Sequence, residues 1–549
     1  MPSKIVRAEE AVALIGNGDV VTVSGCLGLC LPEKVLAALE ARFLTTAEPK
    51  NLTWFDTQYA CAGPGREHFA HEGMLRRVIG VSYYFSPELR RLIRENAVQG
   101  YCMPMGVTHG LLREIACAKP GLLTKVGLHS SYDPRLLGGK LNAVAQESLV
   151  KVVLFEGEER LYYGAFPIDV AIIRGTSADE DGNLSIEEEP LTLDMRFQAL
   201  AAKAGGGRVI AQVKRLVERG SIPPRSVEVP GILVDAIVVD ERQAQNESFP
   251  DRFIFGADGR LKAKMPPIPL LPLDADKIVS RRAALELRAG DLINVGGGIP
   301  MYYLTLLTLE EGIQDLLHIT VEHGAWGGIN YGSTIHVNPV CLMPYDVTWA
   351  LYLGGGLDAT YLGFGQIDRH GNANLDRVGD ERPGGSGGAL IIEHATKKVV
   401  LLGNLSSGGV RVASGEGQLA IRHEGCHAKL VNDVDWISFS GRAMREKGKE
   451  VLVITERAVF RLEREGLVLV ETAPGVDLER DILQRMEFSP LIAPEIKTMD
   501  ERIFRLAPMG LRQQLVGETF RPDPALAREF QSGHIFGALA VLAEAQFRP

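Results

Sequence analysis

Glu322 is the residue whose setting most suggests chemistry. The segment His318-Ile319-Thr320-Val321-Glu322-His323-Gly324-Ala325-Trp326-Gly327-Gly328 is typical of a buried strand that stops at a carboxylate among glycines. Such a carboxylate is either a capping or salt-bridge group, or it is a general base, a metal ligand or a nucleophile. A metal site needs partner ligands, but His323 is adjacent, and neighbouring strand side chains point to opposite faces. His68 and His71 belong to the other half of the chain, at a spacing that fits one face of a helix. The pattern therefore disfavours a metal site.

Glycine is concentrated in four clusters of the second half, which we expect at strand ends. The clusters are Gly296-Gly297-Gly298, Gly324 with Gly327-Gly328, Gly354-Gly355-Gly356, and Gly384-Gly385-Ser386-Gly387-Gly388. Glycine lets the backbone approach a ligand and direct N–H groups at it. Ligands of open α/β sheets bind outside the carboxyl ends of the strands. Together the clusters predict a large, phosphate-bearing ligand and an anionic reaction centre, although tight turning would explain any one of them.

The usual nucleotide-binding motifs are incomplete in this chain. A dinucleotide site needs G-x-G-x-x-G after a strand, and Met301 stands where the last glycine of the Gly296 loop should be. The loop at Gly25 offers only G-x-x-G, and no P-loop with Lys-Ser or Lys-Thr occurs. These gaps disfavour an enzyme that uses a nicotinamide or ATP.

Short runs rich in Val and Ile alternate with helix-like segments, which predicts an α/β architecture with parallel sheets. The expected strands are Asp19–Val23, Lys151–Phe155, Val170–Ile173, Arg208–Val213, Ile232–Val239, Asp291–Val295, His318–Val321, Ala389–Ile392, Lys398–Leu402 and Glu450–Ile454. The expected helices include Pro32–Arg42, Leu193–Ala204 and Lys277–Arg288.

The chain has the pattern of a diverged internal duplication. The first half carries Asp169, Asp179, Gly182 and Asn183, and the second half carries Asp358, Asp368, Gly371 and Asn372 at the same internal spacings. Upstream, Gly18-Asp19 leads to a glycine loop and Pro32, and Gly290-Asp291 leads to another glycine loop and Pro300. We therefore predict two tandem open α/β domains.

Proline marks the expected joint between these domains. The stretch Ser248–Asp274 holds Pro266-Pro267-Ile268-Pro269 and little periodicity. We predict an N-terminal domain over residues 1–250, a linker over 251–275, a C-terminal domain over 276–515, and an extension over 516–549 with a terminal helix near Pro524–Ala545. The alternative for the joint is a long surface loop within one domain.

Composition limits the partners and the compartment. The formal net charge of −10 over 549 residues gives no basic footprint for nucleic acid or for a membrane surface. The seven cysteines are odd in number and form no C-x-x-C pair, which favours a reducing, cytoplasmic compartment. We expect no signal peptide and no membrane span, because neither apolar pattern occurs in the sequence.

Several separate loops resemble family I coenzyme A-transferases, close to the acetate/propionate CoA-transferases, over roughly residues 5–510. In the second half, the matching segments are Thr320-Val321-Glu322 with its following glycines, Asn294-Val295-Gly296-Gly297-Gly298-Ile299-Pro300, Gly354-Gly355-Gly356-Leu357-Asp358, and Asp368-x-x-Gly371-Asn372-x-Asn374. In the first half they are Val126–His129, Asp133–Arg135, Gly138–Asn142 and Val229–Asp235.

The resemblance implies a two-domain fold of the CoA-transferase (NagB/RpiA-like) type with the active site between the domains and Glu322 as nucleophile. It implies CoA contacts from Gly296, Gly297, Gly298, Gly355, Gly356, Gly384, Gly387, Gly388, Asn404 and Lys429, and a substrate pocket near Gly25, Gly28 and Trp326. It also implies acyl-CoA metabolism of short-chain fatty acids, no metal, no cofactor beyond CoA as substrate, and a homo-oligomer, either a dimer or a tetramer. For Lys429, a solvated charge at a strand edge is the alternative.

The same resemblance implies covalent transfer of CoA through a glutamyl-CoA thioester on Glu322. Two other functions stay open: an acyl-CoA hydrolase with the same site, and a non-catalytic CoA-binding protein. The sequence departs from the family pattern near Trp326 and Asn330, in Met343–Leu353, at Ala389 and in Asn404–Gly409. Because these changes surround the expected acyl pocket, we predict an acyl substrate other than acetate or propionate.

Overall fold

The computed structural model describes residues 3–58, 64–251, 253–254, 256–263, 270–330, 335–375 and 385–519. The chain forms two compact units. Unit 1 comprises Met1–Leu261, Leu342–Trp349 and Gly379–Ile391, and unit 2 comprises Lys262–Cys341, Ala350–Val378 and Ile392–Pro549. The domain boundaries given above remain a prediction from the sequence.

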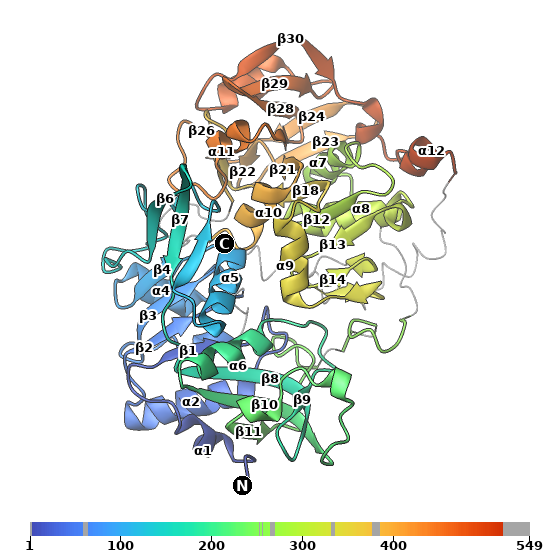
Figure 1. The fold of residues 1–549 in the computed structure, drawn as a ribbon. Coiled ribbons are helices and arrows are strands. Elements are labelled where there is room, and N and C mark those ends of the chain that lie inside the picture. The colour runs from blue at the N-terminus through green and yellow to red at the C-terminus, as the bar shows by residue number, and fades with distance from the viewer. Residues whose placement is uncertain are drawn as a thin grey trace. The chain divides into compact units, whose positions relative to one another are not determined.

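Unit 1 is built on a sheet with the strand order β11-β10-β8-β1-β2-β3-β4, in which every neighbouring pair is parallel (Figure 1). The strands are β1 (Val20–Val23), β2 (Leu52–Phe55), β3 (Leu75–Gly80), β4 (Gln99–Cys102), β8 (Val170–Asp179), β9 (Leu184–Ser185), β10 (Arg208–Val217) and β11 (Ala236–Val239). Strand β9 is paired antiparallel to β8. Every residue of β8 is buried, as expected for a strand covered on both faces.

Helices cover both faces of this sheet. The helices of unit 1 that lie wholly in its first segment are α1 (Ala8–Val12), α2 (Glu33–Thr46), α3 (Pro64–Glu67), α4 (Pro87–Arg94), α5 (Met105–Ala116) and α6 (Met195–Ala204). Val21 and Val23 of β1 pack in one core with apolar residues of α1, α2 and α4. Thr22 points to the other face, where the Gln198 amide of α6 lies 3.2 Å from its hydroxyl oxygen.

One predicted strand of the first half has a different role. Lys151–Phe155 was expected in a buried parallel sheet, but it belongs to β6 (Val150–Phe155) of an antiparallel sheet with the order β5-β7-β6. Strands β5 (Gly121–Thr124) and β7 (Glu158–Gly164) complete it. Glu156 and Gly157 both have positive φ, which makes the tight turn that an antiparallel hairpin needs. Leu154 and Phe155 at its tip are exposed, so the apolar run does not mark a core strand.

Unit 2 is built on a ten-stranded sheet with the order β17-β14-β13-β12-β18-β21-β27-β28-β29-β30. Its strands are β12 (Leu292–Val295), β13 (His318–Thr320), β14 (Ala325–Trp326), β17 (Cys341–Leu342), β18 (Ala359–Gly363), β21 (Lys398–Leu402), β27 (Glu450–Ile454), β28 (Ala458–Glu463), β29 (Gly466–Thr472) and β30 (Leu491–Thr498). The run from β13 to β27 is parallel throughout.

The remaining elements of the second half are short. The helices are α7 (Ala275–Ala284), α8 (Thr305–Glu310), α9 (Tyr345–Leu353), α10 (Ala389–Ala395), α11 (Gly441–Glu446) and α12 (Leu511–Val516). Small two- and three-stranded sheets contain β15 (Ile329–Asn330), β16 (His336–Val337), β19 (Gln366–Asp368), β20 (Ala373–Asn374), β22 (Ser406–Ser407), β23 (Arg411–Ser414), β24 (Leu419–His423), β25 (His427–Ala428) and β26 (Leu430–Val431). Helices α7 and α8 pack on one face of the large sheet, in a core with Ile293, Ile319 and Tyr361.

The prediction of a strand at Ala389–Ile392 is wrong, because these residues begin helix α10. A short apolar run that follows glycine fits a buried helix as well as a buried strand, and periodicity alone does not separate the two.

The two units repeat one topology, which agrees with the predicted duplication. Strands β11-β10-β8-β1-β2 of unit 1 correspond in order to β27-β21-β18-β12-β13 of unit 2. Asp169 accepts a hydrogen bond from the Val20 amide at 2.8 Å, and Asp358 accepts one from the Leu292 amide at 3.0 Å. The matched aspartates thus join equivalent strands in both copies.

The matched Asp-Gly-Asn sets also form the same turn. Asp179 accepts from the backbone and side-chain amides of Asn183, each at 2.9 Å. Asp368 accepts from the same groups of Asn372, at 2.9 and 3.0 Å. The intervening glycines, which the sequence placed at equal spacing, both have positive φ, so each turn requires the glycine found there.

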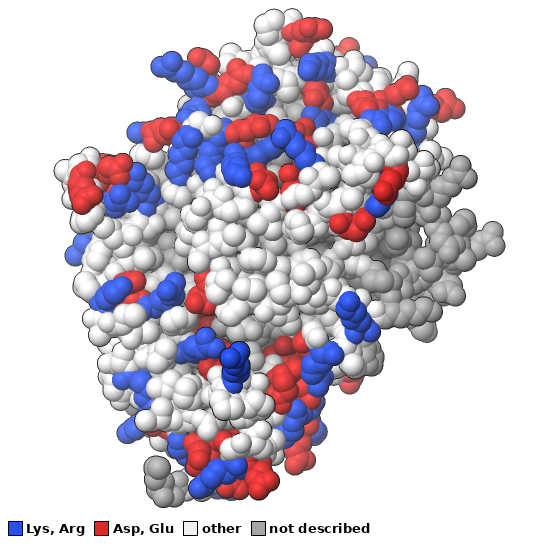
Figure 2. Space-filling model, turned by 45° about the vertical axis from the view of Figure 1, so that its right-hand side comes forward, with Lys and Arg blue, Asp and Glu red and all other residues white. Residues whose placement is uncertain are grey.

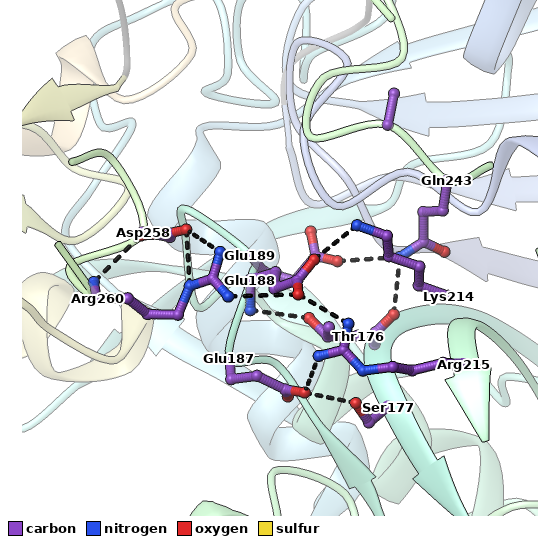
Figure 3. Close-up of polar contacts among 12 residues, drawn as sticks. Thr176, Ser177, Glu187, Glu188, Glu189, Lys214, Arg215, Gln243, Asp258 and Arg260 are labelled. Carbon is purple, nitrogen blue, oxygen red and sulfur yellow. Dashed lines mark hydrogen bonds and ion pairs between the residues drawn. The ribbon is translucent and has the colours of Figure 1, made fainter. Parts of the chain in front are cut away.

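A surface ion network secures the start of the predicted linker (Figure 3). Glu188 accepts from Lys214 and Arg215, each at 2.7 Å, and from Arg260 at 3.3 Å. Asp258 also pairs with Arg260. Although burial alone would raise the pKa of Glu188, hydrogen bonds from Lys214 and Arg215 lower it to about 2. On the face drawn in Figure 2, cationic and anionic side chains are likewise interspersed.

The end of the described chain is anchored to the core of unit 2. Arg281, which is fully buried, donates to the carbonyl oxygens of Arg502, Ile503, Arg505 and Ala507. The Glu311 carboxylate accepts from the backbone amides at the start of α12. Pro266–Pro269 of the predicted linker and the predicted helix Pro524–Ala545 lie outside the described residues. In the described part of the chain, no helix has the length and apolar character needed to cross a membrane.

Candidate active site

Glu322 occupies the corner of a tight turn between two antiparallel strands. Strand β13 ends at Thr320 and β14 begins at Ala325, and Thr320 pairs with Trp326. The Gly324 amide donates to the Val321 carbonyl oxygen at 3.2 Å, which closes a four-residue turn around Glu322. Gly324 has a φ of +106°, a conformation that favours glycine. The carboxylate therefore projects from a turn, not from the strand, and the strand-alternation argument about its neighbour does not apply.

A row of polar side chains lies beside this turn, on the sheet face opposite helices α7 and α8. Asn294 of β12 is paired with Thr320 of β13 and with Thr360 of β18. All three are fully buried, and so is Tyr352 of α9, which lies against them. The Tyr352 hydroxyl oxygen is 2.7 Å from the Thr320 hydroxyl oxygen and 3.3 Å from Asn294 Nδ2. The Thr360 hydroxyl donates to Asn294 Oδ1 at 3.1 Å.

The Glu322 carboxylate is buried but only loosely held. Its exposed fraction is 8%, and its Oε2 lies 3.5 Å from Asn294 Nδ2, at the long limit of a hydrogen bond. Among the described residues, no salt bridge neutralises Glu322. Burial raises the pKa of the Tyr352 hydroxyl, and the nearby Glu322 charge raises it further, so that hydroxyl stays a donor. A buried, uncommitted carboxylate of this kind suits a nucleophile or a base.

The Gly296-Gly297-Gly298 loop follows β12, the strand next to β13. Gly298 has a φ of +87°. No atom lies within 4 Å of the position that a Cβ would take on Gly297 or Gly298. A Cβ on Gly363, at the end of β18, would lie 2.8 Å from the Gly297 carbonyl oxygen, so the loop contacts the next strand end. Its backbone is thus open to a ligand on one side and supported on the other.

Asn404 and Lys429 extend the same edge by one more strand. Asn404 follows β21 and donates to Asp276 at 2.9 Å. The Lys429 ammonium lies 4.1 Å from the centre of the Phe364 ring, just after β18. Burial lowers the pKa of Lys429 to about 8, despite the negative charges of Asp276 and Glu456. The interpretation of Lys429 as a solvated surface charge does not fit this half-buried position.

The structure therefore brings most of the predicted residues of unit 2 to one edge. Strands β13, β12, β18 and β21 are neighbours in the sheet and run parallel. Beyond their carboxyl ends lie, in order, Glu322, the Gly296 loop, Phe364 beneath Lys429, and Asn404. Trp326 pairs with Thr320 and so belongs to the same corner.

Gly355 and Gly356 are not part of this edge. They end helix α9 and precede β18, and their amides donate to carbonyl oxygens of that helix at 3.1 and 3.0 Å. The expectation that every glycine cluster follows a strand is wrong for this one, because its glycines cap a helix.

The other predicted glycines belong to unit 1. The Gly387 carbonyl oxygen accepts from the Met105 amide at 2.9 Å, and Gly388 directly precedes α10. The Gly25–Gly28 loop contains a tight turn in which Leu27 and Gly28 both have positive φ. A Cβ on Gly28 would lie 2.3 Å from the Asn246 side chain, so this loop is packed against its neighbour. Gly384 lies outside the described residues.

Sequence reasoning missed the roles of Thr360 and Tyr352. Asn294 lies within a segment that resembles the family, but nothing in the spacing connects it to a tyrosine on a distant helix. The contact depends on strand pairing and helix packing, which the sequence pattern does not specify. No cluster of three or more His, Cys, Asp or Glu side chains suited to a metal ion occurs within the described ranges.

Known proteins resemble this chain over nearly its whole length. The family model described as Coenzyme A transferase matches residues 5–240. Caffeate CoA-transferase of Acetobacterium woodii is 38% identical over 520 residues, covering 91% of this chain and 97% of the relative. Acetate CoA-transferase YdiF of Escherichia coli K12 is 37% identical over 519 residues, covering 92% of this chain and 96% of the relative.

A solved structure supports the same relationship. The acyl-CoA transferase YdiF of Escherichia coli O157:H7, crystallised as a thioester complex with CoA, superposes with a TM-score of 0.88. It is 36% identical, and the match covers 92% of this chain and 97% of that one. With two curated relatives above 35% identity along almost all of their length, this chain belongs to the coenzyme A transferase family.

Proposed function

We propose that the protein transfers coenzyme A from an acyl-CoA to a carboxylic acid, with Glu322 as the nucleophile and a glutamyl-CoA thioester as the intermediate. The observation that carries this proposal is the setting of Glu322. Its carboxylate is buried at the carboxyl edge of a parallel sheet, has no ion pair among the described residues, and stands next to an open glycine loop. A thioester complex with CoA in the solved relative supports the covalent route.

The chemistry balances without a net proton or electron. A Glu322 oxygen attacks the donor thioester carbonyl, the C–S bond breaks, and CoA thiolate leaves a mixed anhydride. The thiolate then attacks the glutamyl carbonyl carbon, and the donor acid leaves as its carboxylate. The acceptor carboxylate repeats the two steps in reverse, which restores Glu322 and forms the new acyl-CoA. Covalent catalysis of this kind replaces one difficult exchange by easier ones.

Backbone and amide donors are suited to the charge that develops. Each attack forms a tetrahedral oxyanion, and loss of one donor to such an oxyanion costs about 2.7–4 kcal/mol of barrier. We assign the loop Gly296–Gly298 and the Asn294 amide as candidate donors, and Lys429 with Asn404 as candidate contacts for the CoA phosphates. Contacts from Gly387, Gly388 and Gly384 of the other cluster, and a substrate role for Gly25, Gly28 and Trp326, remain part of this proposal.

The acid substrate is best sought beyond acetate. One close relative is named for caffeate and another for acetate, at almost equal identity to this chain. Both a cinnamate-type acid and a short-chain acid therefore belong in the test. Steady-state rates with a matched panel of acyl-CoA donors and acids will rank these substrates. Best activity with acetate or propionate would contradict the prediction that the acyl substrate is a different acid.

Trapping the intermediate is the decisive experiment. Wild-type protein incubated with acyl-CoA and then with hydroxylamine or borohydride should lose activity, and mass mapping should locate the adduct on Glu322. Glu322→Ala should bind CoA but transfer none. Glu322→Asp, which keeps a carboxylate but shortens its reach, is the matched control and should retain a reduced rate. Near-normal transfer by Glu322→Ala refutes the assignment.

The two alternatives give different results in the same assay. With no acceptor acid present, an acyl-CoA hydrolase would release free CoA continuously. A transferase would release one equivalent of donor acid per site and retain the CoA on Glu322 as the thioester. A non-catalytic CoA-binding protein would bind CoA and form no adduct. We further propose a cytoplasmic homo-oligomer, either a dimer or a tetramer, which light scattering on the purified chain will test.

A further inference from the structure

The hydrogens around Asn294 can be assigned one by one. An ionised carboxylate only accepts hydrogen bonds, so the Asn294 atom that faces Glu322 must be the amide nitrogen. Its oxygen then faces Thr360, whose hydroxyl donates to it at 3.1 Å. The Thr320 hydroxyl gives its single hydrogen to the Ile293 carbonyl oxygen at 2.9 Å. Thr320 must therefore accept from the Tyr352 hydroxyl, 2.7 Å away.

With this assignment, each of the two hydrogens of the Asn294 amide has one acceptor. One points to the Tyr352 hydroxyl oxygen at 3.3 Å, and the other points to Glu322 Oε2 at 3.5 Å. Rotation of the amide by half a turn would bring its oxygen against the carboxylate and against the Tyr352 lone pairs. Because all of these groups are buried, water cannot replace the lost partners. The amide is thus fixed in one orientation by the hydroxyl groups of Tyr352 and Thr360, neither of which forms a hydrogen bond with Glu322 among the described residues.

The orientation distinguishes the two carboxylate oxygens. Oε2 faces the Asn294 amide, and no hydrogen bond to Oε1 is found among the described residues. The oxygen that attacks the donor becomes the bridging oxygen of the anhydride and later leaves with the donor acid. The other oxygen stays on Glu322 and carries the negative charge whenever the glutamyl carbon is attacked. Asn294 faces the oxygen that stays.

We infer that Tyr352 and Thr360 are positioning residues, which act through Asn294 to select the attacking oxygen of Glu322 and to hold a donor beside the other one. This inference rests on the proposed function. The contact of 3.5 Å is long in the resting state and would shorten as charge develops on Oε2. An interaction that is stronger in the transition state than in the ground state raises kcat rather than affinity.

The test removes single hydroxyl groups and leaves Glu322 and Asn294 in place. Tyr352→Phe and Thr360→Val should each lower kcat about tenfold, equivalent to ~1.4 kcal/mol of barrier. The KM for acyl-CoA should change by no more than about twofold, because neither residue is assigned a contact with CoA. Thr360→Ser restores the hydroxyl and should recover most of the rate. Tyr361→Phe is the matched control, since it removes another buried tyrosine hydroxyl from the same sheet and should leave kcat unchanged.

A double-variant series shows whether the two hydroxyls act through Asn294. In an Asn294→Ala background, neither Tyr352→Phe nor Thr360→Val should lower kcat further. Equal further losses in that background, or unchanged kcat in both single variants, overturn the inference. If one variant melts far below the wild type, the other decides alone, because both hold the same amide.

The proposed function can fail separately from this inference. If Glu322→Ala is inactive while both hydroxyl variants keep full kcat, the nucleophile stands and the positioning role is wrong. If Glu322→Ala transfers CoA normally, both are wrong. Trapped thioester provides a further measure: the hydroxyl variants should accumulate less Glu322 adduct per second at saturating acyl-CoA, whereas Tyr361→Phe should match the wild type.

Discussion

Gly297→Ala separates a ligand-binding role of the glycine loop from a purely structural one. No atom lies within 4 Å of the Cβ position on Gly297, and its φ is outside the left-handed region. Folding should therefore tolerate the methyl group, and the smaller entropy of the unfolded chain favours the variant by about 0.4–1 kcal/mol. Gly296 and Gly298 are poorer choices. A Cβ on Gly296 would lie 2.7 Å from Leu362, and Gly298 has positive φ.

The effect on activity should be large, because a ligand drawn to this backbone would meet the methyl group. Loss of one hydrogen bond to a charged ligand oxygen costs about 1.5–3 kcal/mol, which is roughly a 10- to 150-fold fall in kcat/KM for acyl-CoA. Steady-state kinetics at saturating acceptor acid and thermal melting measure the two effects on one preparation.

The matched control is Gly415→Ala, where the Cβ position is equally open and φ is likewise outside the left-handed region. It should show the same small gain in stability as Gly297→Ala and leave kcat/KM unchanged. A Gly297→Ala protein with normal melting and full kcat/KM would refute the assignment of this loop to CoA. A Gly297→Ala protein that loses both stability and activity would contradict the claim that a Cβ at this position meets no other atom of the protein.

Three further outcomes follow from charge and burial. Burial lowers the pKa of Lys429 to about 8, so its charge is lost as the pH rises through that value. The KM for acyl-CoA should rise between about pH 7 and 9, and Lys429→Arg should flatten this rise. Although burial alone would lower the pKa of His68, hydrogen bonds to Glu33 and Glu40 raise it. The stability that His68 adds is full below its unfolded pKa of about 6.5 and lost as the pH rises through the folded value. Urea unfolding of His68→Gln should show a weaker loss of stability on the alkaline side. Arg281→Met removes the buried guanidinium that donates to four carbonyl oxygens of residues 502–507, and should lower the free energy of unfolding by about 3 kcal/mol, measured by urea unfolding.

Much of the architecture can be predicted from the sequence because buried parallel strands appear as short, continuous apolar runs. Runs such as Arg208–Val213 and Lys398–Leu402 are rich in Val, and both form strands at the predicted positions. Matched Asp-Gly-Asn spacings predicted the duplication, since each set makes a turn from groups close together in the chain. Turns of this kind can be predicted because all of their hydrogen-bonding groups lie within a few residues of one another.

Features that depend on packing were less accessible. Ala389–Ile392 was predicted as a strand and is helical, and Lys151–Phe155 lies in an antiparallel sheet with an exposed tip. In both cases the segment is apolar, as the sequence shows, but the type of element or sheet predicted for it is wrong. The environment of Glu322 has the same character. The sequence predicted a carboxylate at the end of a strand, but the structure places it in a turn between β13 and β14. Tyr352 lies near it on a helix that the spacing does not connect to the strand.

The hairpin corner at Glu322 has a mechanical consequence for the proposed covalent intermediate. The hydrogen bonds that bind β13 to β12 belong to residues 318–320, before the corner begins. The turn that would carry the thioester is therefore held by strand pairing on both sides, because Thr320 also pairs with Trp326. In the proposed reaction, loading and unloading of CoA require only torsion of the Glu322 side chain and no change in the pairing of β12 with β13.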